Sequence, residues 1–228
     1  MNFFENLRSL NWSALLPYIV NLLVAMPCIT LHELAHGWVA YKLGDPTAKS
    51  RGRLTLNPIK HVDPLGLILM VTLGFGWAKP VPVDMRNFKN PKKGMAITSL
   101  AGPAANFLLS LLVLVIGGIV FRSGWPLRSE IGYYVFIVLV FIAVRSTMLG
   151  IFNLIPIPPL DGSKVVGALL PDRVYYTILR YERYCMIVVF ALCYIGVVST
   201  FIVNIGGFLL DKFCVITFFP REIMSLFI

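Results

Sequence analysis

The stretch ALLPYIVNLLVAMPCITLHELAHGWVAYKL, residues 14–43, decides how the rest of the chain is interpreted. Its first part, up to Leu31, carries no Lys, Arg, Asp or Glu. A helix needs about 20 apolar residues to cross the hydrocarbon core of a bilayer, and this stretch is long enough. It is followed by Gly44-Asp45-Pro46, a typical helix stop. The sequence therefore predicts a membrane-spanning helix that contains a His-Glu-Leu-Ala-His motif at residues 32–36.

The composition of the whole chain extends this interpretation. Its 228 residues are 57% hydrophobic and 14% charged, whereas soluble domains carry about a quarter charged residues. Further runs without charge occupy residues 64–78, 94–121, 131–144, 146–160 and 184–210. We expect an all-α polytopic membrane protein, a bundle of about four to six transmembrane helices. With no repeat or flexible linker, residues 1–228 form one expected domain, with a core at 14–183 and a C-terminal helical segment at 184–228.

Spans are predicted at about 95–121 and 131–155. Residues 184–210 are predicted to form either one tilted helix or a helix and an interfacial piece broken at Gly206-Gly207. The run at 64–78 is short for a span and has basic residues on both sides. It is expected to enter the membrane and return, as a re-entrant β-hairpin or loop over residues 64–83. The alternation in 52–57 predicts a short strand.

The net charge of +9 raises the question of a nucleic-acid partner. The basic residues, however, lie in short connections between apolar runs, where they set membrane orientation. Residues 42–60 and 79–93 hold five Lys or Arg each and residues 164–183 hold four, whereas the N-terminus holds Arg8 alone. We expect no nucleic-acid binding, a multi-pass protein of the cell membrane, an extracytoplasmic N-terminus that is not a cleaved signal, and a cytoplasmic position for these three connections.

The motif at residues 32–36 carries the predicted chemistry. On a helix, His32 and His36 lie on one face, so both imidazoles can bind one Zn²⁺. Glu33 lies beside them and is suited to take a proton from an attacking water. Ionisable groups cost several kcal/mol inside a bilayer unless they are paired, metal-bound or hydrated. A structural polar cluster is the alternative, and the spacing favours a metal site.

A catalytic zinc site needs a third protein ligand and an open position for water. The candidates are Asp161 and His61, the one other histidine of the chain. Asp161 is favoured because the preceding prolines open the helix and bring this acid to the same interface as His36. His61 is interpreted as an interfacial residue.

Four further features of the sequence concern polar or reactive side chains within apolar runs. Asn153 has a neutral amide that suits oxyanion stabilisation, although a helix cap or an interhelical hydrogen bond explains it as well. Asn106, among small residues, is expected to make helix contacts. Arg145, within an apolar run, has no assigned role. The four cysteines (Cys28, Cys185, Cys193, Cys214) are interpreted as packing residues.

Two motifs in this order, HELAH (32–36) and NLIPIPPLDG (153–162), resemble those of the site-2 protease family of intramembrane zinc metalloproteases. The similar stretches GRLTLNPIKHVDPLG (52–66), GWAKPVPV (76–83) and AGPAAN (101–106) extend the likeness over about residues 20 to 185, to the short branch without a PDZ domain. The resemblance implies one Zn²⁺ per chain on His32, His36 and Asp161. It also implies Glu33 as the general base, Asn153 as the oxyanion donor and a re-entrant hairpin after the HExxH helix.

The expected function is that of an intramembrane zinc metalloendopeptidase. It would use a zinc-activated water to hydrolyse peptide bonds in or near transmembrane segments of protein or peptide substrates within the lipid bilayer, with its active site toward the cytoplasm. One alternative is a non-catalytic zinc carrier or degenerate homologue, which would have no need of Glu33. Another is a membrane peptidase for soluble substrates. The sequence predicts neither the substrate nor the oligomeric state.

Overall fold

The computed structural model describes residues 12–66 and 78–228. Four helices in these ranges are long and apolar enough to cross a membrane. They are α2 (Trp12–Lys42), α5 (Pro91–Arg122), α7 (Glu130–Leu154) and α11 (Val197–Thr217). The shorter helices are α3 (Thr47–Ser50), η1 (Pro58–His61), η2 (Met85–Asn87), α6 (Trp125–Arg128), α8 (Asp161–Gly167), α9 (Asp172–Arg180), α10 (Glu182–Tyr194) and α12 (Arg221–Met224). The predicted all-α, multi-pass architecture is confirmed.

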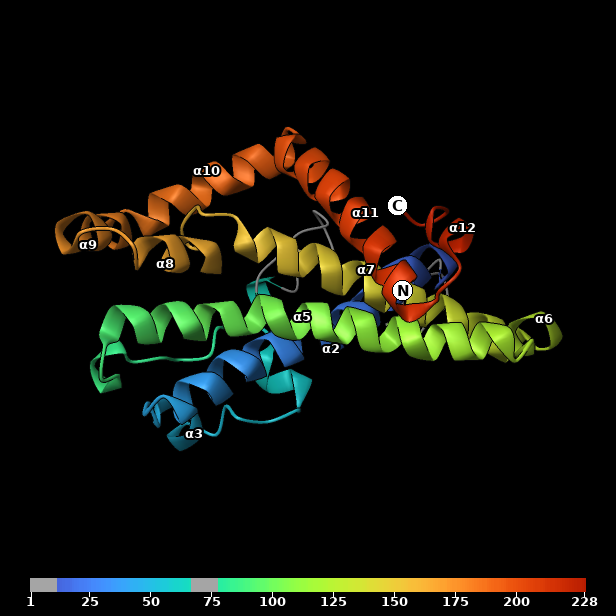
Figure 1. Cartoon of the computed structure of the whole chain (residues 1–228), viewed down its shortest axis with the longest axis horizontal. Helices are drawn as coiled ribbons and strands as arrows, with labels where there is room; N and C mark the ends of the chain where they lie inside the picture. Colours follow the sequence, from blue (N-terminus) through green and yellow to red (C-terminus); the bar gives the residue numbers. More distant parts are fainter. Residues whose placement is uncertain (1–11, 67–77) are drawn as a thin grey trace, which may run out of the picture.

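Helix α5 is the centre of the bundle. It packs against α2, α7, α8 and α11, and Figure 1 shows α5 and α7 running side by side. Close approach depends on small residues, as is usual between membrane helices. Adding a side chain at Gly150 of α7 would crowd the ring of Phe107 of α5. Hydroxyls complete the contact, because Ser110 Oγ donates to the Ala143 carbonyl at 3.0 Å and Thr147 Oγ1 donates to Ser110 Oγ at 2.8 Å.

A hydrophobic cluster joins the ends of α5, α7 and α11 with α12. Its buried members are Val113, Leu114, Phe136, Val140, Ala143, Leu210, Phe213, Cys214, Phe219 and Met224. Cys28 and Cys214 are buried and all four cysteines are free thiols, as expected of packing residues. Arg145, which had no predicted partner, donates a hydrogen bond to the Asn21 side chain of α2. The hydrophobic cluster itself lies at one end of the bundle, away from α8 and α9 (Figure 1).

The break in the C-terminal apolar run differs from the predicted one. The chain turns at Gly196, with φ of 83°, and this glycine separates α10 from α11 (Figure 1). Gly206 and Gly207 instead lie inside α11. A side chain at Gly206 would overlap Met148 of α7, so this glycine serves helix packing rather than a turn. The left-handed conformation at Gly196 is one that glycine adopts without strain.

The predicted strand at 52–57 is wrong. Residues 51–52 form a turn and residues 55–56 a bend, and no residue in 12–66 or 78–228 belongs to a named strand. The Arg53 N–H bonds back to the Ala48 carbonyl at 2.9 Å, which closes a turn after α3. Leu54 packs against α2 at Gly37, where a side chain would overlap it. The alternation therefore reflects one leucine that covers a helix, not a pleated strand.

Most of the predicted re-entrant hairpin, residues 67–77, lies outside the described residues. The two ends of the segment meet, because Val62 and Ala78 form one antiparallel bridge. The Lys79 N–H also donates to the His61 carbonyl at 2.9 Å. The chain thus returns beside its own entry point, and the β-hairpin itself is not seen in the described part.

Asp45 fixes the turn that ends α2. Its fully buried carboxylate accepts hydrogen bonds from Thr47 N–H at 3.0 Å, Asp84 N–H at 2.7 Å and Asn87 Nδ2 at 2.7 Å. Burial alone would raise the pKa of Asp45, but these hydrogen bonds outweigh it and hold the pKa below its ordinary value. One acid therefore joins the end of α2 to η2 on the way to α5.

We predict that Asp45→Ala lowers the free energy of unfolding by about 1–3 kcal/mol, because several buried donors lose their acceptor. Thermal unfolding in detergent measures the effect, with Asp172→Ala, an exposed acid in a surface ion pair with Lys92, as the control. The wild-type advantage should be full above the carboxyl pKa of the unfolded chain, about 3.9. It should disappear as the pH falls through the lowered folded-state pKa. Equal losses in the two variants would contradict this role.

Candidate metal centre

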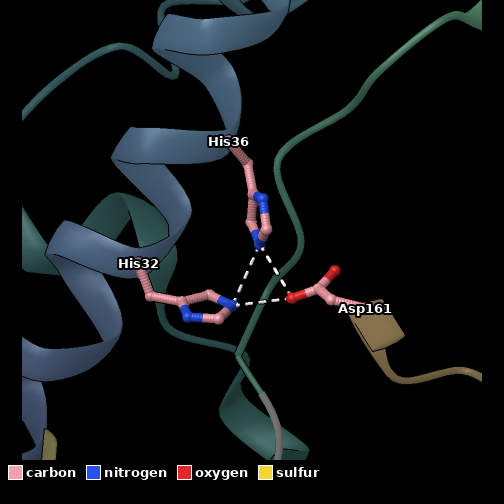
Figure 2. A group of neighbouring side chains, drawn as sticks. All are labelled: His32, His36 and Asp161. Carbon is pink, nitrogen blue, oxygen red and sulfur yellow. Dashed lines mark hydrogen bonds and ion pairs between the residues drawn. The ribbon is translucent and has the colours of Figure 1, made fainter. Parts of the chain in front are cut away.

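Three side chains from two distant parts of the chain meet at one point. His32 Nε2 lies 3.1 Å from Asp161 Oδ2, His36 Nε2 lies 3.1 Å from the same oxygen, and the two nitrogens are 2.9 Å apart. Figure 2 shows both imidazoles extending from α2 toward the carboxylate at the start of α8. All three residues are at least nine-tenths buried. In the described ranges they form the one group of three metal-ligating side chains whose ligand atoms all lie within 4.8 Å of one another.

The backbone around Asp161 explains how an acid reaches a membrane helix. Helix α7 ends at Leu154, and the proline-rich residues 155–160 lead directly into α8, whose first residue is Asp161. A side chain at Gly162 would overlap the Leu154 carbonyl oxygen, so only glycine lets α8 fold back against the end of α7. Contacts of α8 with α5 then hold Asp161 opposite α2.

Helix α5 lines the other side of the imidazoles. His36 Nδ1 donates to the Thr98 carbonyl at 2.7 Å, and the Asn106 side-chain amide lies 3.1 Å from His32 Nδ1. Gly102, midway between them, has no side chain, and a Cβ there would overlap both rings. Thr98, Gly102 and Asn106 are four residues apart, so they form one face of the helix. Each ring is therefore contacted on the nitrogen that points away from Asp161.

The electrostatics keep the acid ionised. Burial of Asp161 favours its neutral form, but the two imidazoles and the Lys164 ammonium, 3.6 Å from Oδ1, outweigh burial and hold its pKa below its ordinary value. Two imidazole nitrogens and a carboxylate oxygen at these separations all present lone pairs to one another. Such a cluster needs a cation or a shared proton at its centre.

The donor set fits zinc. Zn²⁺ takes imidazole nitrogen at about 2.0–2.1 Å and carboxylate oxygen at about 2.0–2.2 Å. The three donor atoms are about 3 Å apart, so a single ion can lie within these bond lengths of all of them. Two histidines and one acid also leave the fourth position for water, as catalytic zinc sites require.

The other predicted residues lie at different places. Glu33 follows His32 on α2, is half-buried, and accepts a hydrogen bond from the Val81 N–H at 2.8 Å. Asn153 lies in the last turn of α7, where its Nδ2 donates to the Leu149 carbonyl at 3.0 Å. No described contact joins Asn153 to the three-residue group. His61 is fully buried within the protein, and its Nε2 lies 2.9 Å from the Thr55 carbonyl, outside the group.

Sequence reasoning missed the part that α5 plays. Asn106 was expected to make helix contacts, and it does so with α2 and α7, but its contact with the ring of His32 was not predicted. The signal was present in the spacing, because Thr98, Gly102 and Asn106 repeat every four residues within an apolar span. Nothing in that spacing said which helix they face, so the pattern alone did not connect them to the metal centre.

Comparison with known proteins agrees with a metal centre at this site. The model of peptidase family M50 matches residues 128–196, which include Asn153 and Asp161. YwhC of Bacillus subtilis is 42% identical over 181 residues, 77% of this chain and 79% of YwhC. Rip2 of Mycolicibacterium smegmatis is 37% identical over 63% of this chain and 53% of its own length. MJ0392 of Methanocaldococcus jannaschii is 27% identical over 65% of this chain and 33% of its own length.

All three relatives carry names that describe zinc metalloproteases. No solved structure matches the chain. The likeness to YwhC extends over most of both proteins, so it reflects a shared family and not a single shared motif. The chain belongs to peptidase family M50, the site-2 protease family that its motifs resemble, and is a zinc metalloprotease of the membrane.

Proposed function

We propose that this metalloprotease cleaves peptide bonds in or near the transmembrane segments of membrane-protein substrates, with one Zn²⁺ held by His32, His36 and Asp161. The convergence of two imidazoles from a membrane-spanning helix with the Asp161 carboxylate from α8 carries the proposal. His36 and His32 lie six and ten residues before the end of α2 at Lys42, which is about 9 and 15 Å along the helix axis. Peptide bonds at that depth belong to segments that enter the bilayer.

Zinc, when bound, supplies Lewis-acid polarisation of the peptide carbonyl and makes water nucleophilic near neutral pH. Glu33 acts as the general base. Its carboxylate is one residue from His32 on α2, and its hydrogen bond with Val81 N–H fixes the position of Oε2. The carboxylate takes the proton of the attacking water and then returns it to the leaving amine.

Asn153 stabilises the negative charge that develops on the carbonyl oxygen. It lies eight residues before Asp161, in the last turn of α7, and its Nδ2 carries two N–H groups. One of them donates to the Leu149 carbonyl, and the other has no partner among the contacts of the described residues. Removal of a donor of this kind costs about 10²–10³ in kcat where it acts on an oxyanion.

The substrate segment is extended when it is cut, because a helix keeps its carbonyls in internal hydrogen bonds. Residues 78–83 pass beside the base, through the contact of Val81 with Glu33. Ala78 already forms a bridge with Val62, so the chain here has the geometry for strand pairing. An unwound substrate segment therefore pairs with this part of the chain.

The active site faces the cytoplasm of the cell membrane, the N-terminus lies on the other side, and residues 1–228 act as one metalloprotease domain. The basic connections contain α3, η1, η2 and α9. Figure 1 shows α9 and α3 toward the end of α5 that lies opposite α6 and α12, and η2 contacts α5. The positive-inside rule gives that end to the cytoplasm.

Replacing Glu33 with Gln should abolish cleavage and retain zinc, because the amide keeps the size of the side chain but accepts no proton. We expect cleavage of a transmembrane model substrate in proteoliposomes to fall by about 10²–10⁴-fold. Zinc content, measured on the same preparation, should stay near one per chain. The exposed Glu130→Gln at the start of α7 is the matched control. Retained turnover in the Glu33 variant would refute the base assignment.

Replacing Asp161 with Ala should remove most of the bound zinc, because two histidines alone leave an incomplete ligand set. Equilibrium dialysis with a metal indicator measures the loss. Asp211→Ala, which breaks an ion pair with Arg221 far from the site, should leave zinc binding unchanged. Full zinc affinity in the Asp161 variant would show that the metal is held elsewhere.

The location of the cut distinguishes a membrane substrate from a soluble one. Mass spectrometry of products from a substrate with one apolar segment between two soluble domains should place the cleavage within that segment or at its edge. Cuts confined to the soluble domains would overturn the proposed substrate class and leave the metal assignment intact.

A further inference from the structure

Asn106 is a buried amide in direct contact with the metal centre. It has no exposed surface, and its side-chain nitrogen position lies 3.1 Å from His32 Nδ1. The oxygen position of the same amide has no hydrogen-bond partner. The Asn106 backbone is fixed, because Ser146 Oγ of α7 donates to its carbonyl at 2.8 Å. A polar group is therefore held against one atom of one ligand.

The tautomer of the His32 ring determines what that contact does. His32 Nε2 faces Asp161 and His36, so a metal in the site takes its lone pair. The single proton of the neutral ring then sits on Nδ1, which becomes a donor. The group opposite Nδ1 must accept a hydrogen bond, and an amide oxygen accepts whereas an amide nitrogen does not.

A rotation of the Asn106 amide by 180° supplies this acceptor. Oxygen and nitrogen of a side-chain amide are distinguished only by their hydrogen-bond partners. The rotation puts the oxygen against His32 Nδ1 and moves the nitrogen to a position that has no partner in either orientation. No other hydrogen bond is lost. The zinc-bound site therefore favours the orientation with the oxygen toward the ring.

We infer that Asn106 is a positioning residue for zinc, which accepts a hydrogen bond from His32 Nδ1–H and so keeps Nε2 free to bind the metal. The inference rests on the proposed metal site. The Thr98 carbonyl does the same for His36, at 2.7 Å from its Nδ1. The acceptor at Thr98 is a backbone carbonyl, which a substitution does not remove. The acceptor at Asn106 belongs to a side chain, so a substitution can remove it. Groups of this kind commonly change metal affinity by about 10–100-fold.

The test compares zinc affinity by chelator competition, in purified full-length protein, for wild type, Asn106→Leu and Asn106→Asp. Leucine has a similar size but no acceptor, and aspartate keeps the acceptor and lacks the donor. We expect the leucine variant to bind zinc about 10–100-fold more weakly and the aspartate variant to stay close to wild type. Absorption of the Co²⁺-substituted proteins provides a second readout that requires no substrate, and the leucine variant should show an altered ligand-field spectrum.

Ser110→Ala is the matched control. Ser110 lies one turn further along α5, is fully buried and bonds to α7, but it touches neither histidine. Its loss should lower the thermal midpoint and leave zinc affinity unchanged. Zinc affinity equal to wild type in Asn106→Leu overturns the inference, and so does a loss in Asn106→Asp as large as that in Asn106→Leu. A wild-type protein that binds no zinc would instead refute the metal site itself.

Discussion

The high free energy of ionisable groups inside a bilayer is the constraint on which the rest of this structure depends. Two imidazoles and a carboxylate are tolerated at that depth only where each satisfies the others or a metal. The triangle of contacts about 3 Å on each side satisfies that condition. The arrangement of α2, α5 and α8 follows from it, because α2 supplies two donors, α8 supplies the third, and α5 covers their outer faces.

Local signals in the sequence were sufficient to predict three of the spans and to single out the three residues that meet in the candidate metal centre. Runs without charge located α2, α5 and α7 to within a few residues, because lipid imposes helix wherever the chain is apolar for long enough. The spacing of His32 and His36 implies a shared face through helix geometry alone. Asp161 could be proposed because the prolines before it end a helix. A polar residue at that point lies near the same interface as His36. Its side chain does lie against both rings.

Features that depend on packing between helices could not be predicted in this way. The last apolar run has glycines at 196 and at 206–207, and the sequence alone does not show which of them ends a helix. Only the contact with Met148 shows that Gly206 is a packing position. Residues 52–57 alternate like a strand but have no partner strand in the described chain, and Leu54 covers α2 instead. The contact of Asn106 with His32 joins residues 74 apart in sequence, so no local rule connects them.

The distance along the chain between the donors also matters during synthesis. His32 and Asp161 are separated by 129 residues, so no early fragment contains all three side chains of the candidate metal centre. A nascent chain that has inserted only α2, α5 and α7 into the bilayer still lacks Asp161. The candidate metal centre is completed only when the segment after α7 emerges and folds back to bring Asp161 to the two histidines. If these three side chains hold the metal, the site cannot act on its own nascent chain or on neighbouring ones before Asp161 has been made.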